Sequence, residues 1–160
     1  MHSFTAQTIA KDTTLIMDLG MTYCYLLTGE RSALLIDSLS GVGDIAAFVR
    51  TLTDLPVIVV NTHGHFDHSA GSFDWGACYI HPDDIALMYE HGAVANRIEY
   101  VQEKQDQLPN GRKIGLDEVT PPRPIYTYPI YDGDQIDLGG RTVEVIQVPG
   151  HTKGTIVLLD

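Results

Sequence analysis

Positive charge is scarce in this sequence: 10 lysine and arginine residues stand against 21 aspartate and glutamate residues, and the formal net charge is −11 at pH 7. A chain this acidic lacks the basic patch with which proteins bind phosphate backbones or anionic lipid. We therefore expect neither a nucleic acid nor a membrane as its partner. We expect a small-molecule substrate instead.

Long apolar runs are missing too. The first residues, Met1 to Ala6, have neither the basic start nor the apolar core of a secretory signal peptide. No stretch approaches the roughly 18 apolar residues of a membrane span. The 2 cysteines, Cys24 and Cys78, each lie in an apolar stretch, so buried thiols are a better interpretation than a disulfide or zinc ligands. These absences favour a cytoplasmic protein.

What is present suits a compact domain. Hydrophobic residues make up 44% of the 160 residues and charged residues 19%, which is ordinary for a globular protein of one domain. An amphipathic pattern predicts a helix over 43–53, and a second helix is expected to begin at Pro82. Runs rich in β-branched, aromatic or other apolar residues predict strands at 13–17, 21–27, 33–36, 57–60, 77–80, 125–130, 135–138, 142–148 and 155–159. This mixture indicates an α/β fold.

Three histidines and an aspartate crowd together directly after the predicted strand 57–60. They are His63, His65, Asp67 and His68. Residues i and i+2 share a face only in extended chain, where they lie about 6.6 Å apart, so His63 and His65 can converge on one ion if the backbone is strand-like. Imidazole nitrogens at roughly 2.0–2.1 Å are ordinary zinc ligands. The pattern predicts a metal site.

The segment Thr62 to His68, with Ala70-Gly71 behind it, resembles the His-x-His-x-Asp-His loop of the metallo-β-lactamase superfamily. A second segment, Val148 to Thr155, is similar to the Pro-Gly-His-Thr segment that carries the next histidine ligand in hydrolases of that family, notably those similar to glyoxalase II. The resemblance covers almost the whole chain. It implies an αββα sandwich, in which residues 1–160 form a single domain that supplies the N-terminal part and lacks much of the second half.

The resemblance also implies a set of metal ligands. His63, His65 and His151 would hold one zinc ion, and Asp67 and His68 would face a second. Asp67 is in addition the candidate catalytic residue, because it could orient the attacking hydroxide and carry its proton. The family's bridging carboxylate and last histidine are not found up to Asp160, which suggests a truncated chain or one completed by another chain or a second copy. Iron is possible in place of zinc.

Other residues leave two interpretations open. In the family a carboxylate at the position of Asp37 supports the metal loop, but a cap or turn residue would look the same in sequence. His81 and His91 are expected at the ends of a helix rather than on the metal. The segment 93–123 is either a lid over the active site or a solvated connection.

The function implied by the resemblance is hydrolysis of a small ester, thioester, lactone or related substrate by a metal-activated water. One alternative from another class is a non-catalytic metal-binding fragment or interaction module that another chain completes. A further alternative is an iron-dependent dioxygenase of the same superfamily.

Overall fold

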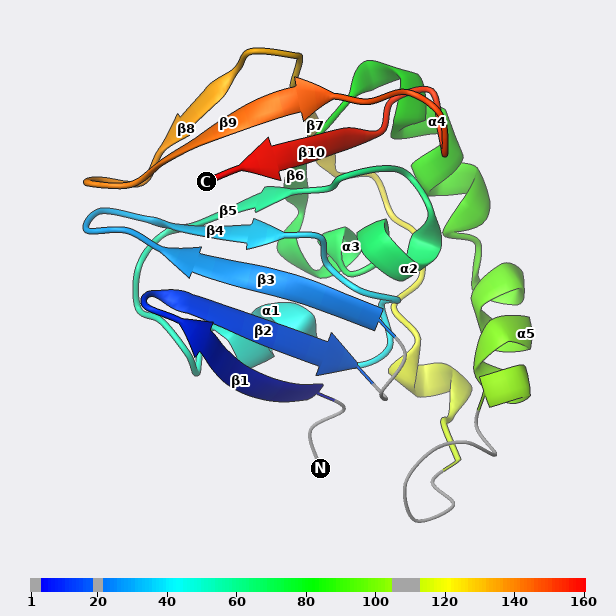
Figure 1. The fold of residues 1–160 in the computed structure, drawn as a ribbon. Helices are drawn as coiled ribbons and strands as arrows, with labels where there is room; N and C mark the ends of the chain where they lie inside the picture. The colour runs from blue at the N-terminus through cyan, green and yellow to red at the C-terminus, as the bar shows by residue number, and fades with distance from the viewer. Residues whose placement is uncertain (1–3, 19–21, 105–112) are drawn as a thin grey trace.

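The computed structural model describes residues 4–18, 22–104 and 113–160, and two β-sheets dominate this part of the chain (Figure 1). The larger, seven-stranded sheet contains, in spatial order, β1 (Phe4–Ala10), β2 (Thr13–Asp18), β3 (Thr22–Thr28), β4 (Ala33–Ile36), β5 (Val57–Val60), β6 (Ala77–Ile80) and β7 (Tyr126–Pro129). The smaller sheet contains β10 (Ile156–Leu159), β9 (Thr142–Gln147) and β8 (Gln135–Asp137).

The larger sheet changes character along its width. Strands β1 to β4 pair antiparallel, as hairpin-connected strands do, whereas β4 to β7 pair parallel. Strand β5 lies among the parallel strands, and all four of its residues are apolar. This uniform pattern is what a strand covered on both faces needs. Because parallel strands end at one edge, the chain that follows β5 lies beside the ends of its neighbours.

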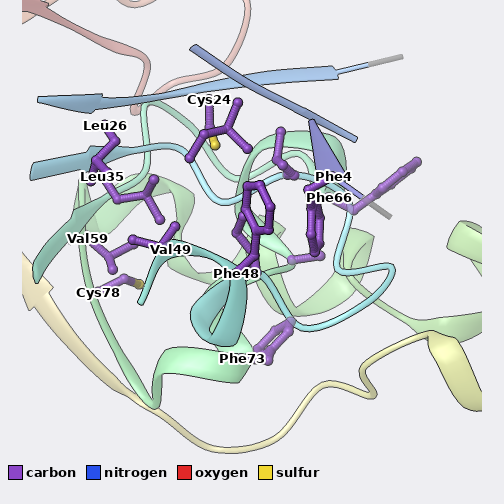
Figure 2. Packing of buried hydrophobic residues seen from close by; sticks show 14 of the residues in the cluster. Phe4, Cys24, Leu26, Leu35, Phe48, Val49, Val59, Phe66, Phe73 and Cys78 are labelled. Atoms are coloured by element: carbon purple, nitrogen blue, oxygen red, sulfur yellow. The ribbon is translucent and has the colours of Figure 1, made fainter. Parts of the chain in front are cut away.

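Helices cover one face of the larger sheet. They are α1 (Ile45–Val49), α2 (Phe66–Ser69), α3 (Ser72–Trp75) and α4 (Pro82–His91). Figure 2 shows the core between them and the sheet, where Phe48 of α1 lies 5.3 Å from Phe4 of β1, centroid to centroid, and Phe66 and Phe73 pack nearby. The helices are short, so this apolar contact rather than helix propensity holds them in place.

The smaller sheet covers the middle of the opposite face. Alternate residues of β9 and β10, including Val143, Val145 and Ile156, are buried against Leu34 and Val60 of the larger sheet. In β10, Val157 and Leu159 point away from this core and are exposed. The described chain thus forms the helix layer and the two sheets expected of an αββα sandwich, with no helix over the outer face of β8 to β10.

Most of the predicted strands are present with bounds shifted by a few residues, but three details were wrong. Strand β1 was not predicted, and it pairs with β2 through residues that have no strong alternation. The helix expected over 43–53 is confined to α1, which begins after the N-cap Asp44. Helix α2, which begins at Phe66 directly after the extended His65, was not predicted either.

The segment 93–123 contains α5 (Val94–Lys104) and a short 3-10 helix, η3 (Leu116–Glu118). Arg97 of α5 is fully buried and donates to the backbone oxygens of Ser40, Gly41 and Thr120. The described parts of the segment are therefore docked on the loop after β4. Residues 105–112 lie outside the described residues, so the lid role stays a prediction.

Candidate metal centre

The first histidine loop begins where β5 ends at the carboxyl edge of the sheet. The backbone N–H of Asn61 still bonds Tyr79 O of β6 at 2.9 Å, and the N–H of Ile156 in β10 bonds Thr62 O at 2.9 Å. Both sheets therefore fix the start of the loop. His65 keeps an extended backbone (φ −68°, ψ 144°) and serves as the N-cap of α2. The alternation needed to aim two imidazoles at one point continues as far as this residue.

Three of the predicted ligands meet in one place. One ligand atom from each of His63, His65 and His151 lies within 4.8 Å of the other two. Nδ1 of His65 approaches Nε2 of His151 to 2.9 Å, and each of the three rings lies less than 5 Å from the others, centroid to centroid. His151 comes from the loop between β9 and β10, so the two sheets bring distant parts of the chain together.

The surroundings of one nitrogen, Nε2 of His63, show whether these residues fit a metal ion. Nε2 of His63 is buried and has no hydrogen-bond partner among the described residues. Buried polar atoms are rarely left without a partner in folded proteins, and a nitrogen that binds a metal ion needs no hydrogen bond. On the same ring, Nδ1 is 3.1 Å from the hydroxyl of Thr62, which leaves Nε2 as the nitrogen available to bind a metal ion. The donor set fits a divalent ion that prefers nitrogen.

Asp67 and His68 lie beside this group rather than in it. The ring of His68 is 4.3 Å from that of His63, centroid to centroid. Nδ1 of His68 lies 2.8 Å from Asp37 Oδ2, and its Nε2 lies 3.5 Å from Asp67 Oδ2. All five predicted ligands thus lie close together. Their division between two ions stays a prediction.

Electrostatics separates the histidines. Burial lowers the pKa of His63 to about 4, with a contribution from the nearby His68. Burial also lowers the pKa of His65, and the neighbouring His91 and His151 add to the effect. Burial acts in the same direction on His68, but the hydrogen bond and charge of Asp37 outweigh it and leave the pKa of His68 raised. Both shifts favour the neutral imidazole of His63 and His65, which is the form that binds a metal ion.

Asp37 supports the loop, as one of the two interpretations predicted. It has a left-handed backbone (φ 63°) just after β4. Its Oδ1 accepts from the backbone N–H of Thr62 at 2.7 Å and from the Thr62 hydroxyl at 2.9 Å, while Oδ2 meets His68. A carboxylate that orients a ligating imidazole through its second nitrogen is a common feature of metal sites. One side chain thus positions both ends of the histidine loop.

Beneath the loop lies a buried polar cluster. Asn61 Nδ2 donates to the Ser72 hydroxyl at 2.9 Å, and Ser38 Oγ lies 3.0 Å from the same hydroxyl. Ser38 Oγ also donates to His68 O at 3.2 Å, and all three side chains are fully buried. A satisfied polar network of this kind specifies one arrangement of the chain. Ser69, the last residue of α2, is also bonded to this loop, because its hydroxyl donates to the backbone oxygens of Gly64 and His65.

Sequence reasoning gave no sign that two residues at the ends of α4 lie near the centre. His91, at the end of α4, lies 4.8 Å from His65, ring to ring, and its Nδ1 accepts from the N–H of Phe66 at 3.5 Å. Asp84, in the first turn of α4, bonds the loops of His65 and His151. Both occupy ordinary positions at helix ends, so no local signal marked them. His81 is the N-cap of α4, as expected, although it is buried.

These features define an α/β sandwich with a candidate metal centre at the carboxyl edge of its larger sheet. The family model described as the metallo-beta-lactamase superfamily matches residues 17–160, and the chain belongs to this superfamily. Membership implies a fold built around a divalent-metal site. None of the described helices has the length and apolar character needed to cross a membrane.

Curated relatives agree with this assignment. The chain is 28% identical over 150 residues to "Acyl-coenzyme A thioesterase MBLAC2" of Gallus gallus, a match that covers 85% of this chain and 52% of that protein. It is 32% identical over 147 residues to "Uncharacterized protein Rv2581c" of Mycobacterium tuberculosis (strain ATCC 25618 / H37Rv), covering 84% of this chain and 58% of that protein. The chain spans about half the length of these relatives.

Solved structures of the same superfamily share the fold. The metallo-beta-lactamase SMB-1, solved in a complex with mercaptoacetic acid, superposes with a TM-score of 0.68 at 20% identity and covers 96% of this chain and 57% of that one. The metallo-beta-lactamase of Cronobacter sakazakii (Enterobacter sakazakii) with a HARLDQ motif superposes with a TM-score of 0.63 at 21% identity, covering 98% and 57%. At this identity the likeness establishes the fold and the partial coverage.

Proposed function

We propose that the protein is a metal-dependent hydrolase of small esters, thioesters, lactones or related substrates. The observation that carries the proposal is the unpartnered, buried Nε2 of His63, on a residue that forms a close group with His65 and His151. Three imidazoles from one side are a protein ligand set that leaves a position open for water or substrate. Imidazole ligands suit zinc and iron among other metals, and we propose zinc, with iron as the competitor.

Each residue has a role in this proposal. His63, His65 and His151 bind one divalent ion, and Asp67 and His68 offer a carboxylate and an imidazole beside it for a second. A bound divalent ion would polarise a carbonyl group and lower the pKa of water toward about 7. Asp67 is 3.5 Å from His68 and partly exposed, so its carboxylate can orient a water molecule at the mouth of the site and carry a proton to the leaving group.

The substrate class draws on a relative and on the packing beside the site. The Gallus gallus relative is named an acyl-coenzyme A thioesterase, which puts thioesters first among the candidate substrates. Tyr100 of α5 packs on Phe66 of the metal loop, with ring centroids 5.1 Å apart. A segment docked there is placed to contact a substrate that approaches the histidines. The lid role of 93–123 is part of the proposal.

The experiment is a substrate panel with a metal-ligand control. The purified chain, loaded with zinc or with iron, is assayed on short acyl thioesters, lactones, carboxylic esters and phosphodiesters beside His63→Ala/His65→Ala. Turnover of at least one class by the loaded chain, lost in the double variant and after chelation, supports the proposal. Equal turnover by the double variant would assign the activity to something else, and oxygen consumption by the iron-loaded chain would favour the dioxygenase.

A further inference from the structure

Asp84 connects the two histidine loops through one side chain. It lies in the first turn of α4 and is only 1% exposed. Its Oδ2 accepts from the backbone N–H of Gly64 at 2.8 Å and from the hydroxyl of Thr152 at 2.6 Å. Its Oδ1 accepts from the backbone N–H of Gly154 at 2.9 Å. Gly64 separates His63 from His65, and Thr152 follows His151 directly.

Two glycines, Gly64 and Gly154, pack closely against Asp84. A Cβ atom added to Gly154 would lie 2.9 Å from Oδ1 of Asp84, and one added to Gly64 would lie 2.6 Å from the backbone oxygen of Asp84. Both loops therefore approach the start of α4 at positions where only glycine fits. The close approach and the hydrogen bonds thus mark the same contact point.

We infer that Asp84 is a positioning residue that holds His151 in place opposite His63 and His65 by bonding both loops at once. The inference rests on the proposed metal site. Asp84 does not touch the candidate ligand nitrogens. It acts through the backbone of the first loop and through the turn of the second, so it sets the distance between the two groups of imidazoles.

A carboxylate is the side chain that this position requires. Backbone N–H groups can only donate, and one lies against each oxygen of Asp84, so both oxygens must accept. Asparagine has the same shape but would present an NH2 group to one of the two N–H donors. The variant Asp84→Asn would thus break one of the two loop contacts without creating a cavity.

The simpler role, an acid that complements the helix dipole, fits the neighbouring residue better. Asp83 occupies the same first turn of α4, and its side chain is 57% exposed, as is typical of a dipole-stabilising acid. The side chain of Asp84 is buried between the loops instead. Asp83→Asn therefore serves as the matched control, since it removes the same charge from the same turn.

The test is the zinc affinity of the folded protein, measured by competition with a chromophoric chelator for the original chain, Asp84→Asn and Asp83→Asn. Removal of a residue that orients metal ligands weakens binding about 10- to 100-fold, and we expect Asp84→Asn to fall in this range. Asp83→Asn should bind within about twofold of the original. The absorption spectrum of the cobalt-substituted protein should change in Asp84→Asn alone, because the geometry of the three nitrogens changes.

A general loss of stability must be separated from positioning. Leu35→Ala, which opens a cavity in the core under the larger sheet, should lower the melting temperature of the metal-free protein and leave the zinc affinity unchanged. If it weakens zinc binding as much as Asp84→Asn does, Asp84 acts only through stability and the inference is wrong.

Two further outcomes are decisive. If the original chain binds no zinc or cobalt, the proposed metal site fails. If it binds the metal and Asp84→Asn binds equally well, the site stands and the positioning role is wrong.

Should Asp84→Asn not fold, Thr152→Val and Thr152→Ser replace it. Valine removes the hydroxyl that Asp84 binds, and serine keeps it, so only valine should weaken zinc binding. Equal affinity of these two variants would contradict the inference.

Discussion

The two histidine loops differ in how they are held. The loop after β5 is embedded in the structure. His63 is buried, Asp37 accepts from the backbone N–H of Thr62, and Asn61 at the start of the loop donates to the buried hydroxyl of Ser72. The loop between β9 and β10 is exposed from Val148 to His151. It is held by a few hydrogen bonds: the N–H of Thr152 bonds the hydroxyl of Thr155 at 2.9 Å within the turn, and Asp84 bonds Thr152 and Gly154.

Because of this difference, we expect changes in the two loops to affect folding stability and metal affinity differently. A change in the first loop disturbs the sheet edge and the buried polar cluster, so it should lower both folding stability and metal affinity. A change in the second loop touches little of the core and should act on metal affinity alone. The contrast arises because His151 depends on a few hydrogen bonds, whereas His63 is surrounded by packed chain.

The largest effect is expected from removing both ligands of the first loop. His63→Ala/His65→Ala leaves His151 as the one member of the close group, and metal affinity should fall roughly 100-fold or more. Metal content after purification, measured by inductively coupled plasma mass spectrometry, checks this. Glu144→Gln, an exposed change in β9, is the control. Equal metal content in the double variant and the original would rule out the proposed ligands.

Next in size is the contrast between His151→Ala and His68→Ala. His151 belongs to the group of three nitrogens, whereas Nδ1 of His68 is already bonded to Asp37. We expect His151→Ala to weaken the tightest ion about tenfold or more, and His68→Ala to weaken it less. Titration against a competing chelator measures both affinities. A larger loss in His68→Ala would mean that the ligands are assigned to the wrong ions.

Asp37→Asn should lower stability and metal affinity together. The amide cannot replace both carboxylate oxygens, which accept from Thr62 and meet His68, so one buried contact is lost. The free energy of unfolding should fall by about 1–3 kcal/mol, measured by urea denaturation of the metal-free protein. Zinc affinity should fall about tenfold. A loss of affinity with unchanged stability would show that the first loop is less embedded than its contacts indicate.

The smallest effect is expected from Thr155→Val in the second loop. Its hydroxyl accepts from the N–H of Thr152 and lies 2.7 Å from the Thr152 hydroxyl, in a turn that is partly buried. Zinc affinity should fall a few-fold, and the free energy of unfolding should change by less than about 1 kcal/mol, as for one partly exposed hydrogen bond. Thr155→Ser, which keeps the hydroxyl, should restore the affinity. A drop in stability as large as that of Asp37→Asn would remove the contrast between the loops.

The sequence predicted the histidine cluster because its signal is local. His63, His65, Asp67 and His68 follow one apolar strand within a few residues, and the strand geometry limits where their side chains can point. The resemblance of both motifs to one family then supplied the partner, His151. The α/β class followed in the same way from alternating strand and helix patterns.

The supporting contacts were much harder to predict. Asp84 has partners 20 residues before it and 68 to 70 residues after it, and an acid in a first helical turn already suits the helix dipole. Arg97 lies in a polar stretch that is typical of a solvated helix, yet its side chain is buried under backbone oxygens of a distant loop. The contacts of Asp84 and of Arg97 depend on tertiary structure, so no periodic pattern in the sequence predicts them.

The most direct test of the proposed site is the number and donor type of the ions that the chain binds. Zinc titration of the metal-free chain, combined with zinc X-ray absorption at one equivalent, reports both. The geometry of His63, His65 and His151 predicts one tight ion with three imidazole nitrogens among its donors. No tight ion, or one tight ion bound mainly by carboxylate oxygens, would contradict it.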